Sequence, residues 1–93
     1  MAIRFAPSAF RHGIDEDRAR DVIEQCPDPI YEPDAIHSGA DRVLFLGPDR
    51  RGIPIEVLAI ELPNGELVVF HAMRLRSRYR DDYHRVMEWH SGP

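Results

Sequence analysis

The sequence predicts a single α+β domain over residues 1–93, in which a small antiparallel meander of three to four strands packs with an N-terminal and a C-terminal helix. Three observations lead to this fold class. A chain of 93 residues can build only one modest core. Apolar residues recur at helical spacing near both ends of the chain. Three apolar segments between them are joined by connections too short for a parallel crossover.

The first predicted helix begins after Asp15, whose carboxylate suits the N-cap position. Two acidic residues follow in the first turn, where the helix dipole favours negative charge. Pro27 and Pro29 end the helix, because proline cannot continue the backbone hydrogen-bond pattern. Before the helix, residues 1–13 form a short mixed segment with no predicted element. The apolar stripe of the helix consists of Ala19, Val22, Ile23 and Cys26.

Three strands are predicted in the middle of the chain, over residues 42–47, 53–62 and 66–72. A turn at residues 48–52 joins the first two. The Asn-Gly pair at residues 64–65 joins the last two, since this pair readily adopts positive φ. In the preceding connection, residues 27–41, a brief edge strand is predicted at Ile30 and Tyr31.

Both faces of this sheet need cover. Val57 and Leu58 are apolar on successive positions, as are Val68 and Val69, so they point to opposite faces. The two helices can cover one face. The other face would then be covered by the N-terminal segment or by another protein chain.

The last predicted element is a helix over residues 77–89. Its apolar and aromatic residues recur at intervals of three and four, which is typical of one buried helix face. These residues are Tyr79, Tyr83, Val86, Met87 and His90.

The charge of the chain is unevenly distributed. All twelve basic residues are arginine, and against 16 acids they give a net charge of −4. Residues 71–80 nevertheless contain Arg74, Arg76, Arg78 and Arg80 and no acid. Such a local field can attract an anion to a protein that is acidic as a whole.

Composition also excludes several classes of protein. No apolar run approaches the roughly 20 residues of a membrane span, so no membrane partner is expected. Cys26 is the single cysteine and cannot form an internal disulfide, which suits a reducing cytoplasm. No ligands converge at spacing typical of a metal site, and no cofactor-binding motif is present, so neither metal nor cofactor is expected.

The acid-free segment at residues 71–80 is the candidate site. Its arginines can neutralise phosphate oxygens and the charge that develops during phosphoryl transfer. His71 can serve as a general acid or base, and Tyr79 or Tyr83 can donate a proton or stack on a base. Glu56 or Glu61, on the longest strand, can orient the arginines. An alternative interpretation is purely structural: exposed arginines, a strand-end histidine and core tyrosines.

Three stretches together resemble BrnT-type toxins. Residues 11–17 (RHGIDED) with Ala19 resemble the K/R-H-G-V/I … E/D-x-A opening of that family. Residues 42–47, followed by Gly52, resemble its R-x-x-x-L-G … G segment. Residues 69–83 resemble its final strand and arginine-rich helix.

This resemblance implies a RelE-like fold and the toxin of a type II toxin–antitoxin pair. Such a toxin is a metal-independent RNA endonuclease that inhibits translation and is held inactive by a DNA-binding antitoxin, with a homodimer or hetero-oligomer as the assembly. On this chain, the resemblance implies Arg74, Arg76 and Arg80 as phosphate clamps and His71 or Tyr79 as the proton-transfer group. Further RNA contacts are expected from Arg78, His12 and Arg11.

Two other functions remain open from the residues alone. One is a non-catalytic protein–protein interaction module that uses an uncovered sheet face. The other is a nucleic-acid binder without chemistry, which the net charge of −4 disfavours.

Overall fold

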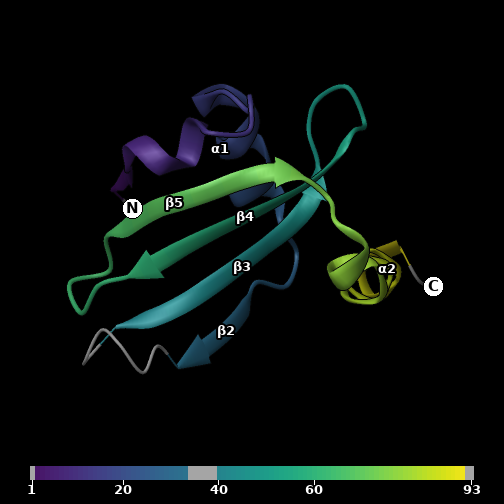
Figure 1. The fold of residues 1–93 in the computed structure, drawn as a ribbon. Coiled ribbons are helices and arrows are strands. Elements are labelled where there is room, and N and C mark those ends of the chain that lie inside the picture. The colour runs from purple at the N-terminus through teal and green to yellow at the C-terminus, as the bar shows by residue number, and fades with distance from the viewer. Residues whose placement is uncertain (1, 34–39, 92–93) are drawn as a thin grey trace.

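The computed structural model describes residues 2–33 and 40–91, which form one five-stranded sheet flanked by helices (Figure 1). The strands are β1 (Ile3–Phe5), β2 (Ile30–Pro33), β3 (Asp41–Pro48), β4 (Pro54–Glu61) and β5 (Leu67–Arg74). Strands β2 to β5 pair in order and antiparallel, as the sequence predicted, and β2 is the predicted edge strand. The α+β class is therefore confirmed.

Strand β1 lies at the other edge of the sheet and was not predicted. It pairs parallel with β5, with Ile3 opposite Leu67, so the sheet order is β1-β5-β4-β3-β2. A short connection excludes parallel pairing only between strands that follow one another in the chain. Here α1 and three strands separate the two partners, so a parallel pairing is sterically open. A three-residue strand also leaves little periodicity to read from sequence.

The first helix, α1 (Glu16–Gln25), begins as predicted. The side chain of Asp15 accepts a 2.9 Å hydrogen bond from the backbone nitrogen of Arg18. The next residue after the helix, Cys26, is extended, and prolines follow. Ala19, Val22 and Ile23 are buried against the sheet, as the apolar stripe predicted.

The last helix, α2 (Arg80–Ser91), begins three residues later than predicted. Residues Ser77–Tyr79 form instead a 3₁₀ turn, η2, in which the nitrogen of Tyr79 donates to the carbonyl of Arg76 at 3.0 Å. The tighter turn follows an extended Arg76 that offers no side-chain cap, so the first free N–H groups close on i−3 carbonyls.

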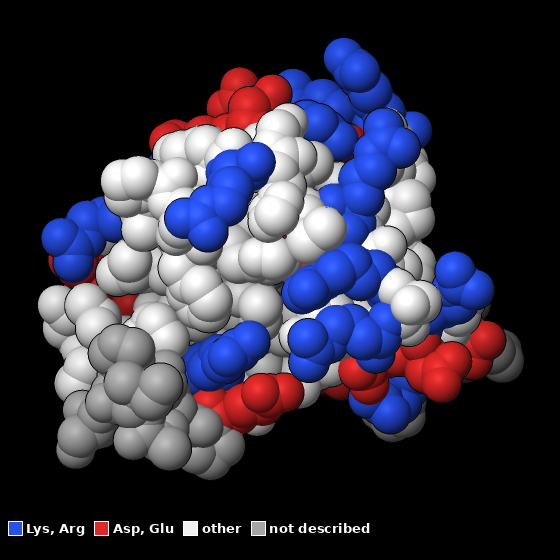
Figure 2. Space-filling model, viewed as in Figure 1, with Lys and Arg blue, Asp and Glu red and all other residues white. Residues whose placement is uncertain are grey.

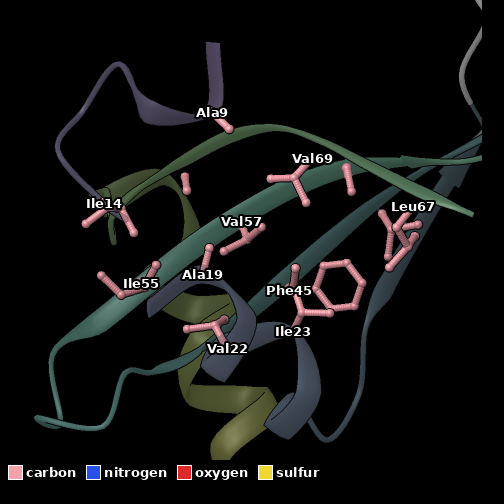
Figure 3. Packing of buried hydrophobic residues seen from close by; sticks show 13 residues of the cluster. Ala9, Ile14, Ala19, Val22, Ile23, Phe45, Ile55, Val57, Leu67 and Val69 are labelled. Atoms are coloured by element: carbon pink, nitrogen blue, oxygen red, sulfur yellow. The ribbon is translucent and has the colours of Figure 1, made fainter. Parts of the chain in front are cut away.

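Two apolar clusters cover the two faces of the sheet. The first lies between the sheet and α1 with the preceding 3₁₀ turn, η1 (Pro7–Phe10). Figure 3 shows Ala19, Val22 and Ile23 packed near Val57 and Phe45. The second cluster, on the other face, consists of Leu44, Leu46, Leu58 and Tyr79.

The helices therefore do not share one face. Leu75, in the two-residue link after β5, packs on the second cluster, so η2 and the beginning of α2 start on that face. Leu44, Leu46 and Leu58 are at most 4% exposed, so no additional chain is needed to bury them. Among the described residues, no helix is long and apolar enough to cross a membrane.

The turn between β3 and β4 is organised by a buried carboxylate. Asp49 Oδ1 accepts from the backbone nitrogens of Arg51 and Ile53 at 2.9 and 3.0 Å, and Oδ2 accepts from Arg18 Nε at 2.9 Å. Burial acts to raise the pKa of Asp49, but these hydrogen bonds hold it below its usual value. The carboxylate thus ties the turn to α1.

Replacing Asp49 by alanine is expected to lower the melting temperature by about 10 °C, because three donors lose their acceptor inside the fold. Asp21→Ala is the matched control. Its partner Arg50 is 66% exposed, so the loss should be only a few degrees. Thermal unfolding followed by circular dichroism measures both. Equal losses in the two variants would show that Asp49 has no special role.

Candidate functional site

A β-bulge in β5 shapes the candidate site. Leu58 of β4 is opposite His71 and its neighbour Ala59 is opposite Val69, which leaves Phe70 as the extra residue. A bulge puts two successive side chains on similar sides of a strand. Phe70 packs on the second cluster, and His71 reaches Glu56 on the same face.

Glu56 is the centre of a hydrogen-bonded group that we term the Glu56 cluster: Glu56, His71 and Arg76. The carboxylate is fully buried. Its Oε1 accepts from the backbone nitrogen of Arg76 at 2.8 Å. Its Oε2 accepts from Arg76 Nε at 2.9 Å and Nη2 at 2.6 Å, and lies 2.9 Å from His71 Nε2. Glu56 therefore joins β4, β5 and the link that follows.

The Glu56 carboxylate is ionised at neutral pH. Burial acts to raise its pKa, but hydrogen bonds from Arg76 and His71 hold the pKa below its ordinary value of 4.5. Arg76 carries the balancing charge, since the Glu56 carboxylate raises the pKa of its guanidinium further. An ionised carboxylate only accepts hydrogen bonds.

The protonation of His71 follows from these contacts. Burial lowers the pKa of His71 below its ordinary value of 6.5, and this outweighs the opposing influence of Glu56, while Arg76 and His12 lower it further. The neutral ring must carry its proton on Nε2 in order to donate to Glu56. Arg76 Nη2 lies 3.4 Å from His71 Nε2. Because both nitrogens then carry protons, they form no hydrogen bond with each other. Nδ1 is left unprotonated and able to act as a base.

The N-terminal segment also reaches this site. The ring of His12 lies 5.4 Å from the ring of His71, centroid to centroid, in an edge-on arrangement. The preceding Arg11 is exposed and forms no ion pair with a described residue. The structure thus brings His12 and His71 together from distant parts of the chain.

The four arginines predicted as one group divide into two pairs. Arg76 and Arg78 both lie over the ring of Tyr79, with 5.6 and 5.0 Å from guanidinium carbon to ring centroid. Arg74 and Arg80 line a separate open hollow of about 370 Å³. The division arises because residues 74–80 are neither one strand nor one helix. Arg74 ends β5 opposite Ile55, whose side chain belongs to the first cluster, whereas Arg80 begins α2.

Most arginines outside this segment are neutralised by a carboxylate: Arg4, Arg18, Arg20, Arg50 and Arg85 each form an ion pair. Within the segment, Arg76 is paired with Glu56. In contrast, Arg74, Arg78 and Arg80 form none within residues 2–33 and 40–91. Figure 2 shows arginine side chains gathered over the link between β5 and α2. Within the described residues, unpaired positive charge is therefore concentrated between the end of β5 and the beginning of α2.

The tyrosines have different environments. Tyr79 is 8% exposed and belongs to the second cluster. Tyr83 is partly buried at the hollow, and burial raises the pKa of its hydroxyl. The role of Tyr79 in proton transfer stays a prediction, as does the stacking of Tyr79 or Tyr83 on a base.

The sequence suggested that Glu56 or Glu61 orients the arginines, and the structure selects Glu56. Glu61 instead accepts from the Tyr31 hydroxyl at 3.0 Å. The contact of Glu56 with His71 was not predicted. A carboxylate within the apolar run Ile55–Ile60 is the signal that marks it, because a charge buried in a strand requires partners.

The described part of the chain contains no group of three or more His, Cys, Asp or Glu side chains that could hold a metal ion. Comparisons with protein-family models, with curated proteins and with solved structures give no match to this chain.

Proposed function

We propose that this chain is a metal-independent RNA endonuclease in which His71 is the general base. The observation that carries the proposal is the contact between buried Glu56 and His71, which leaves Nδ1 of a neutral imidazole unprotonated. Arg78, which forms no ion pair with a described residue, shares the Tyr79 ring with Arg76 of the Glu56 cluster. A base beside a site for a phosphate anion is what transesterification of RNA requires.

In the proposed step, Nδ1 of His71 accepts the proton of a ribose 2′-hydroxyl. The 2′ oxygen attacks the adjacent phosphorus as the bond from phosphorus to the 5′ oxygen breaks. The leaving oxygen takes a proton from the imidazole of His12, whose ring lies 5.4 Å from that of His71. The products are a 2′,3′-cyclic phosphate and a 5′-hydroxyl.

The arginines have separate parts in this proposal. Arg76 is committed to Glu56 through two guanidinium nitrogens, so it acts as a positioning residue that keeps the carboxylate in place. Arg78, which lies over Tyr79 and has no carboxylate partner among the described residues, stabilises the charge on the reacting phosphate. Arg11 adds positive charge beside His12.

The biological setting in the proposal is that of a type II toxin. Support comes from the sequence resemblance to BrnT-type toxins and from an antiparallel meander between an N-terminal and a C-terminal helix, the arrangement that this resemblance implies. The proposed partners are an RNA substrate and a DNA-binding antitoxin, in a cytoplasmic homodimer or hetero-oligomer. An RNA binder without chemistry is the outcome if binding occurs without cleavage.

The interaction-module hypothesis is less well supported. That hypothesis requires an apolar face of the sheet that no part of this chain covers, so that a partner can bind there. Leu46 on the second face is 1% exposed and Val57 on the first is fully buried, so both faces have cover of their own.

The purified protein is expected to cleave single-stranded RNA in the presence of EDTA and to leave 2′,3′-cyclic phosphate ends. An oligonucleotide of the same sequence with 2′-deoxy sugars should remain intact, because it lacks the nucleophile. Gel analysis and end-group mass spectrometry measure both. Cleavage of the 2′-deoxy strand, or no cleavage of any RNA by the free protein or by the protein added to translating ribosomes, would contradict the proposal.

A further inference from the structure

The open hollow of about 370 Å³ lies apart from the Glu56 cluster, since none of Glu56, His71 and Arg76 lines it. Its size is in the range of pockets that bind small molecules. Its wall is made by residues from the beginning of β4, the end of β5 and the first turns of α2: Ile53, Pro54, Arg74, Leu75, Arg80, Tyr83 and His84.

The walls of the hollow are held together by the backbone. The nitrogen of Leu75 donates to the carbonyl of Pro54 at 3.1 Å, which fixes the end of β5 against the beginning of β4. Leu75 also packs on the second cluster together with Tyr83 of α2. Three elements are thus joined around the hollow, so its shape is a property of the fold.

The charge in the hollow is positive and uncompensated. Arg74 and Arg80 both line it, and neither forms an ion pair within the described ranges. The acids of the same helical turn, Asp81 and Asp82, do not line it, and Asp82 is paired with Arg85. Two guanidiniums at one opening favour a phosphate group, whose oxygens accept paired N–H donors.

The remaining lining suits a planar apolar group. Ile53, Pro54 and Leu75 provide an apolar wall, and Tyr83 provides a partly buried aromatic ring. His84 contacts the Tyr83 ring edge-on at 6.2 Å between centroids, which restricts the orientation of the tyrosine. Stacking of a base on such a ring contributes about 1–3 kcal/mol in single-strand binding.

We propose that this hollow binds one nucleotide of an RNA strand, with the phosphate between Arg74 and Arg80 and the base against Tyr83. The proposal rests on the proposed function and adds a binding subsite to it. Arg74 and Arg80 then hold a phosphate next to the scissile one and contribute to substrate binding, whereas His71 acts on the reacting group.

The test uses the full chain, adenosine 5′-monophosphate, inorganic phosphate, and an uncleavable 2′-O-methyl RNA tetranucleotide. Affinities come from calorimetry, and the His84 ring proton reports occupancy of the hollow by NMR. The double variant Arg74→Ala/Arg80→Ala should weaken binding of the mononucleotide at least about tenfold. Arg85→Ala, which removes an arginine from the same helix but outside the hollow, should change it less than about twofold.

A second variant separates the base from the phosphate. Tyr83→Leu should weaken binding of adenosine monophosphate about tenfold and leave binding of inorganic phosphate unchanged. The tetranucleotide should bind at least about tenfold more tightly than the mononucleotide, because its other phosphates reach Arg78. Equal affinities would assign the hollow to a free mononucleotide and overturn the RNA strand as its occupant. An unshifted His84 proton would overturn the site altogether.

Cleavage kinetics distinguish this subsite from the proposed function. If the wild-type protein cleaves RNA, the double variant should have a KM about tenfold higher than the wild type and a kcat within about twofold of it. A fall in kcat at constant KM would overturn the subsite and return both arginines to the reacting phosphate. The wild-type protein could instead bind the mononucleotide through Arg74 and Arg80 but cleave no RNA. That result would contradict the proposed function and leave the hollow as a nucleotide-binding site.

Discussion

Replacement of His71 by alanine is expected to slow RNA cleavage by about 10²–10⁴-fold, the usual contribution of a general base. The side chain is partly buried, and its Nε2 is held by Glu56 at 2.9 Å, so the ring and the Nδ1 that we propose as the base are already oriented. The loss should appear in kcat, because the base acts in the transition state. Single-turnover cleavage of a labelled RNA measures it.

Arg4→Ala, at a 65% exposed arginine on β1, is the control and should cleave at the wild-type rate. A folded His71→Ala protein, verified by circular dichroism, that retains more than about a third of wild-type activity would contradict the assignment.

The pH profile provides a second readout of the same base. Because the pKa of His71 in the free protein lies below 6.5, the unprotonated base persists as the pH falls. The acid limb of kcat/KM, which reports the free protein, should therefore have its midpoint below pH 6.5. Glu56 acts to raise this pKa, so Glu56→Gln should move the midpoint to a lower pH still. A purely structural Glu56 would leave the midpoint unchanged.

Replacement of Glu56 by alanine is expected to reduce the free energy of unfolding by about 3 kcal/mol. Losses of this size are typical when one partner of a buried ion pair is removed and the other charge is left uncompensated. The carboxylate is fully buried and accepts three hydrogen bonds from Arg76 and one from His71. Its removal leaves these donors without an acceptor and opens a space next to its cross-strand neighbour Leu46. Urea unfolding followed by circular dichroism measures the loss.

Glu61→Ala is the matched control on the same strand. This carboxylate is only partly buried and accepts from the Tyr31 hydroxyl at an exposed position, so the variant should lose less than about 1 kcal/mol. Similar losses at the two positions would contradict a central role for Glu56.

The pH dependence of stability tests the charge of Glu56. Its pKa is lower in the folded chain than the ordinary 4.5, so its ionised form stabilises the fold above about pH 4.5, and this stabilisation is lost as the pH falls through the lowered pKa. The difference between the wild type and Glu56→Gln should therefore be present at neutral pH and shrink below pH 4.5. A difference independent of pH would show that ionisation of Glu56 contributes nothing.

The elements that could be predicted have strong local signals. Asp15 caps α1, and the prolines after it end the helix. The Asn64-Gly65 turn, with φ of +87° at the glycine, closes the hairpin between β4 and β5. Strand β1 could not be predicted, because its pairing with β5 depends on a partner more than 60 residues away.

The candidate site was predictable as a composition but not as a geometry. The sequence by itself determined the α+β class, the meander and an acid-free segment with four arginines beside His71, since these depend on local periodicity, turn chemistry and charge. Only the tertiary structure decided that Glu56 holds His71 and Arg76 and that Arg74 and Arg80 share a hollow. The reason is physical: a bulge at Phe70, a 3₁₀ turn before α2 and the register of β4 against β5 set the direction of each side chain. None of the three is specified by the spacing of the arginines along the chain.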